Sequence, residues 1–249
     1  MTAVRVLAIA GSDSSGGAGI QADIKTITML GGYAMTAITA LTAQNTKAVH
    51  GVEPVGPEMV AAQIDACLDD IGVDAVKIGM LGSPDIAGIV AARLARLDVP
   101  VVFDPVMVAS SGGTLADPAT IAAFEPLMRL ATLTTPNVAE LEALGGHAGM
   151  AARGVAYLAK GGDAAGQMIV DELVCPDGRR LPFEGSRIVT TSTHGTGCTL
   201  SSAIAVGLGR GLPLPEAIDR ARAFVRSALR AAPGFGKGAG PLGHAQART

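Results

Sequence analysis

The segment Thr193–Leu200, with the sequence THGTGCTL, combines residue types that could bind and stabilise an anion. Two glycines flank a threonine, and the small residues that follow predict a helix. A glycine loop at a helix N-terminus leaves several backbone N–H groups free to donate and adds the positive end of the helix dipole. Such donors suit a phosphate, and they suit a transferring phosphoryl group better because they are aimed at charge that develops in the transition state. The alternative is a helix that begins with small residues only for close packing.

Cys198 falls in the first turn of this predicted helix. A thiol in that position can have a lowered pKa and be partly ionised, which favours a functional role. The alternative is a buried structural cysteine, the commoner kind in general. Cys67 and Cys175 are assigned no role. His194, next to the glycine loop, stays open, whereas three histidines without partners at metal-ligand spacing are predicted to face solvent: His50, His147 and His244.

Asp104, Asn137 and Glu140 follow the ends of successive predicted strands. Carboxylates in such positions could hold Mg²⁺, which prefers one or two carboxylates together with phosphate oxygens and water. Asn137 could instead be a helix N-cap, and Glu140 a first-turn acid favoured by the helix dipole. Both of these structural roles are compatible with function. Lys160 ends another predicted strand and could contact a phosphate, although an isolated lysine is most often solvated.

The loop after the first predicted strand, GSDSSGGAG, contains the dinucleotide-binding pattern at Gly17–Ala22. The first glycine of that pattern comes seven residues after the strand ends at Ala10, which is too late for the tight turn. The second strand is followed by Gln44 and Asn45, so no acid is placed for a ribose hydroxyl. A Walker A loop is excluded as well, because Gly11-x4-Gly16 is followed by Gly17 and not by Lys.

Apolar strand patterns and helical patterns alternate over the first 140 residues. Strands are predicted at Val4–Ala10, Tyr33–Leu41, Ala75–Ile78, Val99–Phe103 and from Leu133. Helices are predicted at Ala18–Leu30, Pro57–Ile71, Pro84–Leu97 and Pro118–Leu130. This alternation predicts βαβ units and a mostly parallel sheet, so the polar and glycine-rich loops named above meet at one edge, where ligands bind.

The remaining residues are predicted to form strands with a hairpin turn at Pro176–Arg179, then two closing helices at Gly197–Leu208 and Pro215–Ala231. The chain has no internal repeat, linker or charge block, so one domain is predicted over residues 1–249. The uncharged stretch 26–46 holds two glycines, six threonines, a glutamine and an asparagine. It is too polar for a membrane span and is predicted to be a helix end followed by a strand.

Composition excludes several classes of function. The 19 Lys and Arg residues and 22 Asp and Glu residues give a net charge of −3, and aromatic residues are only 3% of the chain. This argues against nucleic-acid binding, which needs a basic surface or stacking platforms. The three cysteines are widely spaced, contain no C-x-x-C pair and fit a reducing, cytoplasmic compartment.

Eight segments in order along the chain resemble a known family: AIAGSDSSGGAGIQADIKT, TALTAQNT, KIGML, DPVMVASSG, TPNVAELEAL, KGG, THGTGCTLSSAIA and GKGAGPLGH. The family is that of the hydroxymethylpyrimidine and phosphomethylpyrimidine kinases of thiamine synthesis, in the ribokinase-like superfamily. The resemblance runs from about Val4 to His244. It implies a ribokinase-like three-layer α/β/α sandwich and a homodimer. It also implies that ATP with Mg²⁺ phosphorylates 4-amino-5-hydroxymethyl-2-methylpyrimidine and then its monophosphate.

The resemblance implies a role for each matching residue. Gln44 would hydrogen-bond the aminopyrimidine, in a pocket lined by Ala18, Asp23, Met80 and Val106. The anion hole would be formed by Gly195, Thr196, Gly197 and Cys198, with Cys198 in the position of the aspartate base of sugar kinases. The metal and the phosphates would be managed by Asp104, Asn137, Glu140 and Lys160, and Lys237 would lie near the nucleotide.

Three departures from the family pattern fall on the expected nucleotide side. The segment before KGG is short, so its helix is predicted to be reduced or missing. Asp163 follows KGG where the family has His, and Gly243 stands where Asn or His is usual. Two other readings remain open: a pyridoxal kinase of the same superfamily, and a non-catalytic pyrimidine-binding module. The intact GTGC, NxxE and DP motifs argue against the second of these.

Overall fold

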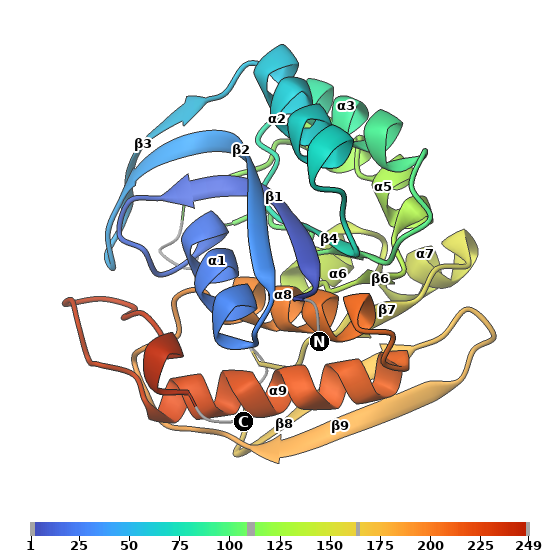
Figure 1. The fold of residues 1–249 in the computed structure, drawn as a ribbon. Helices are drawn as coiled ribbons and strands as arrows, with labels where there is room; N and C mark the ends of the chain where they lie inside the picture. The colour runs from blue at the N-terminus through green and yellow to red at the C-terminus, as the bar shows by residue number, and fades with distance from the viewer. Residues whose placement is uncertain (1–2, 109–112, 163–164, 248–249) are drawn as a thin grey trace.

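The computed structural model describes residues 3–108, 113–162 and 165–247, and within them nine strands form one sheet (Figure 1). Their order is β3-β2-β1-β4-β5-β6-β7-β8-β9. The neighbours from β2 to β7 are parallel, whereas β3 is antiparallel to β2, β8 to β7 and β9 to β8. The strands are β1 (Arg5–Asp13), β2 (Tyr33–Gln44), β3 (Val49–Pro54), β4 (Ala75–Ile78), β5 (Val101–Phe103), β6 (Leu133–Thr134), β7 (Tyr157–Ala159), β8 (Met168–Val174) and β9 (Arg180–Ser186).

Helices cover both faces of the sheet (Figure 1). They are α1 (Gly19–Met29), α2 (Pro57–Asp70), α3 (Pro84–Leu94), α4 (Pro118–Ala122), α5 (Glu125–Leu130), α6 (Val138–Ala143), α7 (Gly146–Arg153), α8 (Thr196–Gly209), α9 (Leu214–Arg230) and the short 3₁₀ helix η1 (His244–Gln246). The core residues divide into two clusters, one beneath α1, α8 and α9 and one beneath α2 to α7. This is the predicted three-layer α/β/α sandwich, with a mostly parallel central sheet.

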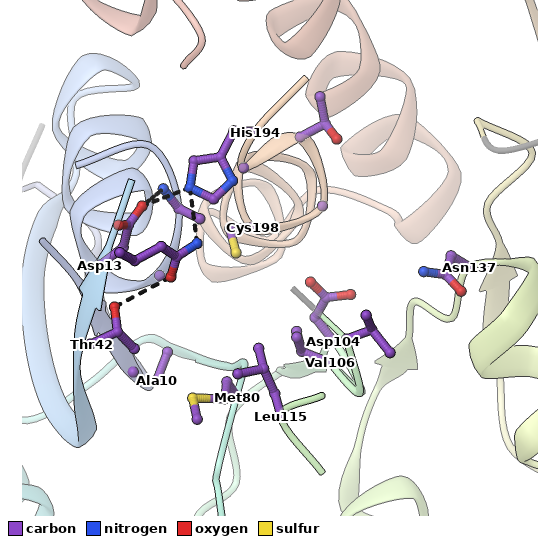
Figure 2. A pocket seen from close by; sticks show the side chains of 18 of the residues that line it. Ala10, Asp13, Thr42, Met80, Asp104, Val106, Leu115, Asn137, His194 and Cys198 are labelled. Atoms are coloured by element: carbon purple, nitrogen blue, oxygen red, sulfur yellow. Dashed lines mark hydrogen bonds and ion pairs between the residues drawn. The ribbon is translucent and has the colours of Figure 1, made fainter. Parts of the chain in front are cut away.

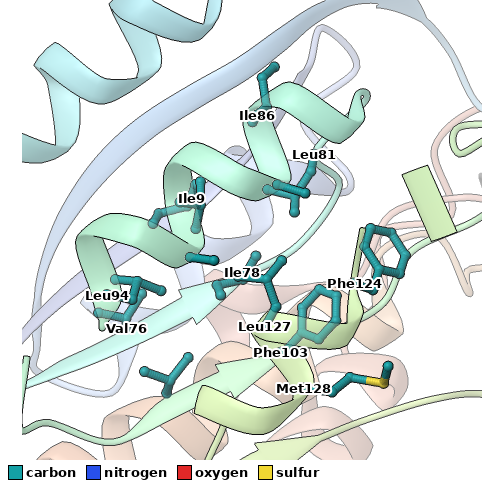
Figure 3. Close-up of a cluster of buried hydrophobic side chains, with 14 of the residues drawn as sticks. Ile9, Val76, Ile78, Leu81, Ile86, Leu94, Phe103, Phe124, Leu127 and Met128 are labelled. Atoms are coloured by element: carbon teal, nitrogen blue, oxygen red, sulfur yellow. The ribbon is translucent and has the colours of Figure 1, made fainter. Parts of the chain in front are cut away.

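The two core clusters follow from the alternation of side chains along buried strands. In β1, Leu7 and Ile9 belong to one cluster, and Val6 and Ala8 belong to the other. Figure 3 shows part of the first cluster, where α3 and α5 pack on β4 and β5. The Phe103 and Phe124 rings meet edge to face, with centroids 5.1 Å apart. Such packing holds the ends of these strands in fixed positions.

α8 is the most buried of the described helices, since every residue from Thr199 to Leu208 is buried. It contacts β1, β4 and β5 on one side and α1 and α9 on others. A helix that is apolar all round belongs inside the fold. Its N-terminus is consequently fixed relative to the carboxyl ends of the central strands, where ligands bind in open α/β sheets.

Most predicted elements are confirmed, with some shifted ends. The strand Ala75–Ile78 has the predicted bounds, and the Pro176–Arg179 hairpin turn joins β8 to β9. The predicted helix Pro118–Leu130 is instead two short helices, because Pro126 has no N–H to continue the first one and opens α5. Strand β3 was not predicted, because its residues VHGVEP are mostly exposed and lack a buried face.

The uncharged stretch 26–46 consists of the end of α1 followed by β2, as predicted. Across the ranges that the structure describes, no helix is both long and apolar enough to cross a membrane.

Candidate active site

A cavity opens at the carboxyl ends of the central strands, against the N-terminus of α8 (Figure 2). It extends from Asp13 and Thr42 at one end to Asn137 at the other, with Cys198 and Asp104 between them. The structure brings most of the predicted site residues together in its wall: Ala18, Gln44, Met80, Asp104, Val106, Asn137, Glu140, Lys160, Gly195, Thr196, Gly197 and Cys198. Asp23 and Lys237 are not part of this wall.

The first turn of α8 presents backbone donors to the cavity. Gly195 has a φ of +87°, and a Cβ there would lie 1.9 Å from the Gly17 carbonyl oxygen, so only glycine fits. The Thr196 N–H donates to Thr193 O, and the Thr199 N–H donates to Gly195 O. The N–H groups of Gly197 and Cys198 have no backbone acceptor within the described parts of the chain. These two donors fit an anion that enters the cavity.

The thiol of Cys198 is not activated, which corrects the expectation of a lowered pKa. Burial raises the pKa of Cys198 to about 11 and outweighs the opposing effect of the nearby Lys77 charge. Position in the first turn of a helix predicted the opposite shift, but burial disfavours the charged thiolate more than that position favours it. Near neutral pH the sulfur therefore carries its hydrogen.

Asp23 lies behind the cavity wall and does not line it, so its predicted role in the pocket stays a prediction. Its carboxylate accepts two hydrogen bonds of 2.9 Å from Lys77 Nζ and one of 2.8 Å from Ser202 Oγ. Both charged side chains are fully buried, and the Asp23 charge raises the pKa of Lys77 against the opposing effect of burial. The pair connects α1, β4 and α8. Sequence reasoning did not find Lys77, although one lysine inside the apolar run AVKIG requires a buried partner.

Lys160 lies between the two acids predicted to bind metal. Its Nζ is 2.7 Å from Asp104 Oδ1 and 3.8 Å from Glu140 Oε2. Asp104 Oδ2 points instead toward the start of α8, since a Cβ on Gly197 would lie 3.3 Å from it. Asp104 and Glu140 thus offer two carboxylates, and one Asp104 oxygen faces the first turn of α8. This arrangement fits the ligand preference of Mg²⁺, which completes its shell with phosphate oxygens and water.

Asn137 and Glu140 also have the structural roles that the sequence offered as alternatives to function, at the N-terminus of a helix. The Asn137 side chain accepts from the Glu140 N–H at 2.8 Å, and Glu140 Oε2 accepts from the Asn137 N–H at 2.8 Å, which forms a capping box on α6. Burial raises the pKa of Glu140 to about 7, against the effect of Lys160. Both residues line the cavity as well, so capping places them where they can serve a ligand.

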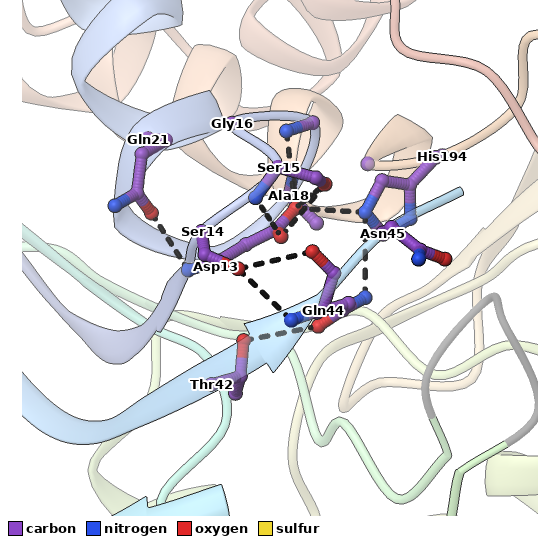
Figure 4. A network of polar contacts seen from close by, with 12 residues as sticks. Asp13, Ser14, Ser15, Gly16, Ala18, Gln21, Thr42, Gln44, Asn45 and His194 are labelled. Carbon is purple, nitrogen blue, oxygen red and sulfur yellow. Dashed lines mark hydrogen bonds and ion pairs between the residues drawn. The ribbon is translucent and has the colours of Figure 1, made fainter. Parts of the chain in front are cut away.

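A polar network at the other end of the cavity was not predicted (Figure 4). Asp13 Oδ2 lies 2.8 Å from His194 Nε2 and accepts from the N–H groups of Gly17 and Ala18. Burial opposes ionisation of Asp13, but these bonds and those from Ser15 lower its pKa to about 2. The Gln44 carboxamide completes the network, 3.4 Å from His194 Nε2. Asp13 and His194 are 181 residues apart, so no local pattern pairs them.

A second cavity adjoins the first. It is lined by apolar side chains of α8 and α9, among them Leu200, Val225 and Leu229, and by Arg187 and Arg226. Four residues line both cavities: Lys160, Gly162, Thr196 and Gly197. The two spaces therefore meet where the first turn of α8 offers its N–H groups. Two ligands bound in them would have their nearest ends at the same donors.

Comparison with known proteins agrees with this geometry. The family model for phosphomethylpyrimidine kinase matches residues 13–243. The chain belongs to this kinase family. A hydroxymethylpyrimidine/phosphomethylpyrimidine kinase of Rhizobium meliloti is 46% identical, over 98% of this chain and 97% of the relative.

Solved structures show the same fold. An ADP complex of Bacillus subtilis pyridoxal kinase has a TM-score of 0.90 and 34% identity, and the match covers 98% of both chains. A phosphomethylpyrimidine kinase of Clostridium difficile has a TM-score of 0.75 and 38% identity, over 90% of this chain and 99% of that one.

The C-terminal segment of the kinase contacts the loop that follows β2. Lys237 is exposed, and the adjacent Gly238 N–H donates to Thr46 Oγ1 at 3.2 Å, near the end of β2. Lys237 lines neither of these two cavities, and its place beside the nucleotide stays a prediction. Gly243 lines neither cavity and packs against the end of α9, where a Cβ would lie 2.0 Å from Ala231 O.

The structure tests two further predictions about the C-terminal half of the kinase, one on the helix before KGG and one on His244. The helix before the KGG strand is present as α7, with eight residues. Asp163 lies outside the described residues. His244 was predicted to face solvent but is buried, with Nε2 2.9 Å from Thr199 Oγ1, which donates to Gly195 O. His244 therefore stabilises the first turn of α8 through its hydrogen bond with Thr199.

We expect the loss of one partner of the Lys77–Asp23 pair to lower the stability of the fold, and the replacement of both partners by apolar residues to restore most of it. Lys77→Met leaves a buried carboxylate without its counterion, which should lower the free energy of unfolding by about 3–5 kcal/mol. The double variant Lys77→Met/Asp23→Leu removes both charges and should recover most of that loss. Urea denaturation of the wild type, both single variants and the double variant measures this. A double variant no more stable than Lys77→Met would contradict the assignment.

We also expect His244 to make stability depend on pH. Burial lowers the pKa of His244 to about 4 in the folded kinase, whereas the unfolded chain keeps an ordinary value near 6.5. Between these values only the unfolded state binds the proton, so stability falls as pH drops from 6.5 to 4, by up to about 3 kcal/mol. His244→Gln keeps a donor for Thr199 but does not titrate. Thermal unfolding at pH 7 and pH 4.5 should show a smaller loss in this variant, and equal losses would refute the prediction.

Proposed function

We propose that this kinase transfers the γ-phosphoryl group of ATP to the hydroxymethyl group of 4-amino-5-hydroxymethyl-2-methylpyrimidine and then phosphorylates the monophosphate, a reaction sequence of thiamine biosynthesis. The observation that carries the proposal is the meeting of two cavities at the N–H groups of Gly197 and Cys198. One cavity would take the acceptor and the other the nucleotide. The name of the Rhizobium meliloti relative gives the pyrimidine, and the similar Bacillus subtilis pyridoxal kinase was solved as an ADP complex.

The first cavity suits a flat heteroaromatic ring with polar edges. Met80, Val106 and Ala18 supply apolar wall, and Gln44 supplies one donor and one acceptor from a single carboxamide. An aminopyrimidine presents the complementary pair, a ring nitrogen that accepts and an amino group that donates. Met80 is itself held by contact with β2, where Thr39 Oγ1 donates to its carbonyl oxygen at 2.7 Å.

Phosphoryl transfer would occur at the junction of the cavities. The transition state is loose, with charge on the transferring group, so positioning and charge stabilisation matter more than base strength. The N–H groups of Gly197 and Cys198 would donate to the oxygens of the transferring phosphoryl group. The Lys160 ammonium, which lies beside Asp104, would compensate the negative charge of that group. Asp104 and Glu140 would hold Mg²⁺, which supplies further neutralisation of phosphate charge, and Asn137 would bind phosphate nearby.

The second cavity would take the nucleoside part of ATP. Its wall combines apolar side chains for a base with the guanidinium groups of Arg187 and Arg226. Arg222, behind them, is paired with Asp171 at 2.8 Å, and Asp171 also accepts from the Gly161 N–H at 2.8 Å. This pairing holds the KGG segment, and with it Lys160, at the boundary between the two cavities.

Cys198 would contact the acceptor hydroxyl without acting as a strong base. Its sulfur is protonated at neutral pH because burial raises its pKa. It can accept a weak hydrogen bond from the hydroxyl and so orient it for transfer. The backbone donors would supply most of the stabilisation. As the resemblance implies, we also expect a homodimer, for which exposed apolar side chains on β2 and β3, including Leu41 and Val52, offer a surface.

Pyridoxal phosphorylation is a second candidate, favoured by the TM-score of 0.90 to a pyridoxal kinase. Pyridoxal is also a flat heteroaromatic ring with a hydroxymethyl group, but it has no amino group beside a ring nitrogen for Gln44. Coupled ADP release separates the candidates. We expect saturable ADP release with the pyrimidine and a kcat/KM at least about tenfold lower with pyridoxal, because one wrongly paired buried polar group costs this much. A preference for pyridoxal would refute the proposal, and no ADP release with either would favour a binding module.

The role of Cys198 is tested with Cys198→Ala. We expect kcat to fall by about tenfold and the pyrimidine Kd to change little, since a true general base is worth about 10²–10⁴-fold. Steady-state kinetics and calorimetry measure the two quantities. Unchanged turnover would remove Cys198 from the mechanism, and a loss greater than about 10³-fold would make it an essential base after all.

A further inference from the structure

Three polar side chains meet at the carboxyl ends of the neighbouring strands β5, β6 and β7. Phe103 and Thr134 are opposite each other at the ends of β5 and β6, so the next residue of each segment brings Asp104 beside Thr135. Lys160 follows the end of β7. The Asp104 carboxylate, which lies in the wall of the first cavity (Figure 2), therefore has a hydroxyl and an ammonium as neighbours.

Both neighbours donate to the same oxygen of Asp104. Thr135 Oγ1 donates to Asp104 Oδ1 at 2.9 Å, and Lys160 Nζ donates to that atom at 2.7 Å. No hydrogen bond from a described residue reaches Asp104 Oδ2, which faces the first turn of α8 and lies 3.3 Å from the place that a Cβ on Gly197 would occupy. One oxygen of the carboxylate is thus engaged within the protein, and the other is available to a ligand.

Thr135 is the more constant of the two donors. It is fully buried, and its backbone N–H donates to Phe103 O at 2.9 Å, so its hydroxyl has little freedom to move. The Lys160 ammonium is on a flexible stem at the boundary between the two cavities, where a phosphate can attract it. When Lys160 turns toward a phosphate, the Thr135 hydroxyl still holds Asp104 Oδ1.

We propose that Thr135 is a positioning residue, which holds Oδ1 of Asp104 and so presents Oδ2 to the Mg²⁺ that accompanies the nucleotide. The inference rests on the proposed function. Carboxylates that bind a metal are themselves hydrogen-bonded, and the loss of such a partner lowers metal affinity strongly. Without the Thr135 hydroxyl, the Asp104 carboxylate would be free to turn whenever Lys160 leaves it, and metal binding would have to order it again.

The preceding residue offers a matched comparison. Thr134 has the same side chain, is equally buried and lies one position earlier, at the end of β6. Its Oγ1 has no hydrogen-bond partner within the part of the chain that the structure describes. Thr134→Val therefore removes a buried hydroxyl without a contact, whereas Thr135→Val removes one that is bonded to Asp104.

The experiment measures the Kd of AMP-PCP, a non-hydrolysable ATP analogue, by calorimetry with saturating Mg²⁺ and again with EDTA. The Kd with EDTA divided by the Kd with Mg²⁺ gives the contribution of the metal to binding. We expect Thr135→Val to keep the Kd with EDTA and to lower this ratio by about tenfold or more. Thr135→Ser keeps a hydroxyl and should restore the wild-type ratio, and Thr134→Val should leave it unchanged. General damage to the nucleotide cavity would change both constants together, so a merely structural role of Thr135 would not alter their ratio.

A second comparison tests whether Thr135 acts through Asp104. Asp104→Asn should itself lower the ratio, and in that background Thr135→Val should cause little further loss. In Glu140→Gln, which keeps an acceptor for the capping box, one metal ligand is weakened but Asp104 is intact, and Thr135→Val should again have its full effect. Equal losses in the two backgrounds would show that Thr135 does not act through Asp104 and would overturn the inference.

The inference is also overturned if Thr135→Val keeps the wild-type ratio, or if Thr134→Val lowers the ratio as much. If Thr135→Val does not fold, Thr135→Cys, whose thiol donates only weakly, decides by the same ratio. A wild type that binds AMP-PCP under neither condition, or equally with Mg²⁺ and with EDTA, would overturn the proposed function, and with it the inference. Binding that depends on Mg²⁺ in the wild type and equally in Thr135→Val would overturn the inference alone.

Discussion

The N–H groups of Gly197 and Cys198 have no backbone acceptor among the described residues and are free to donate to a ligand, and the rest of the site is arranged around these two donors. They are fixed because α8 is buried on all sides between the sheet and α9. Two further sets of contacts hold α8 near this turn. Asp23 accepts hydrogen bonds from Lys77 and from Ser202 of α8, and Thr199 of α8 is hydrogen-bonded to His244. Donors held in this way need little rearrangement when charge develops near them, which is the condition for electrostatic catalysis.

Each of the two lysines near the turn has a carboxylate partner before any ligand binds, and the site holds three carboxylates against these two lysines. Asp104 and Glu140 compensate Lys160, and Asp23 compensates Lys77, so neither lysine carries an unpaired buried charge. A phosphate that enters adds negative charge beside these acids, which explains why a divalent cation suits the same place. The neutral thiol of Cys198 suits this arrangement, because a thiolate would add one more negative charge to a site that already holds three buried carboxylates.

Much of the fold and the cavity could be predicted from sequence because their causes are local. Apolar runs of strand length, glycine at strand ends and small residues after Gly195 depend only on neighbouring residues. The contacts that the sequence did not predict join distant segments: Asp13 with His194, Asp23 with Lys77, and Thr199 with His244. The raised pKa of Cys198 was missed for a related reason, since burial by the tertiary fold outweighs the helix position that favoured ionisation.

The most direct test of the account is a crystal structure of the kinase with ADP, Mg²⁺, aluminium fluoride and the aminopyrimidine, in which the fluoride complex marks the transferring phosphoryl group. The account predicts that the aluminium fluoride lies within hydrogen-bond distance of the Gly197 and Cys198 N–H groups, between the two cavities. An aluminium fluoride bound away from the first turn of α8, with those two groups facing solvent, would contradict it.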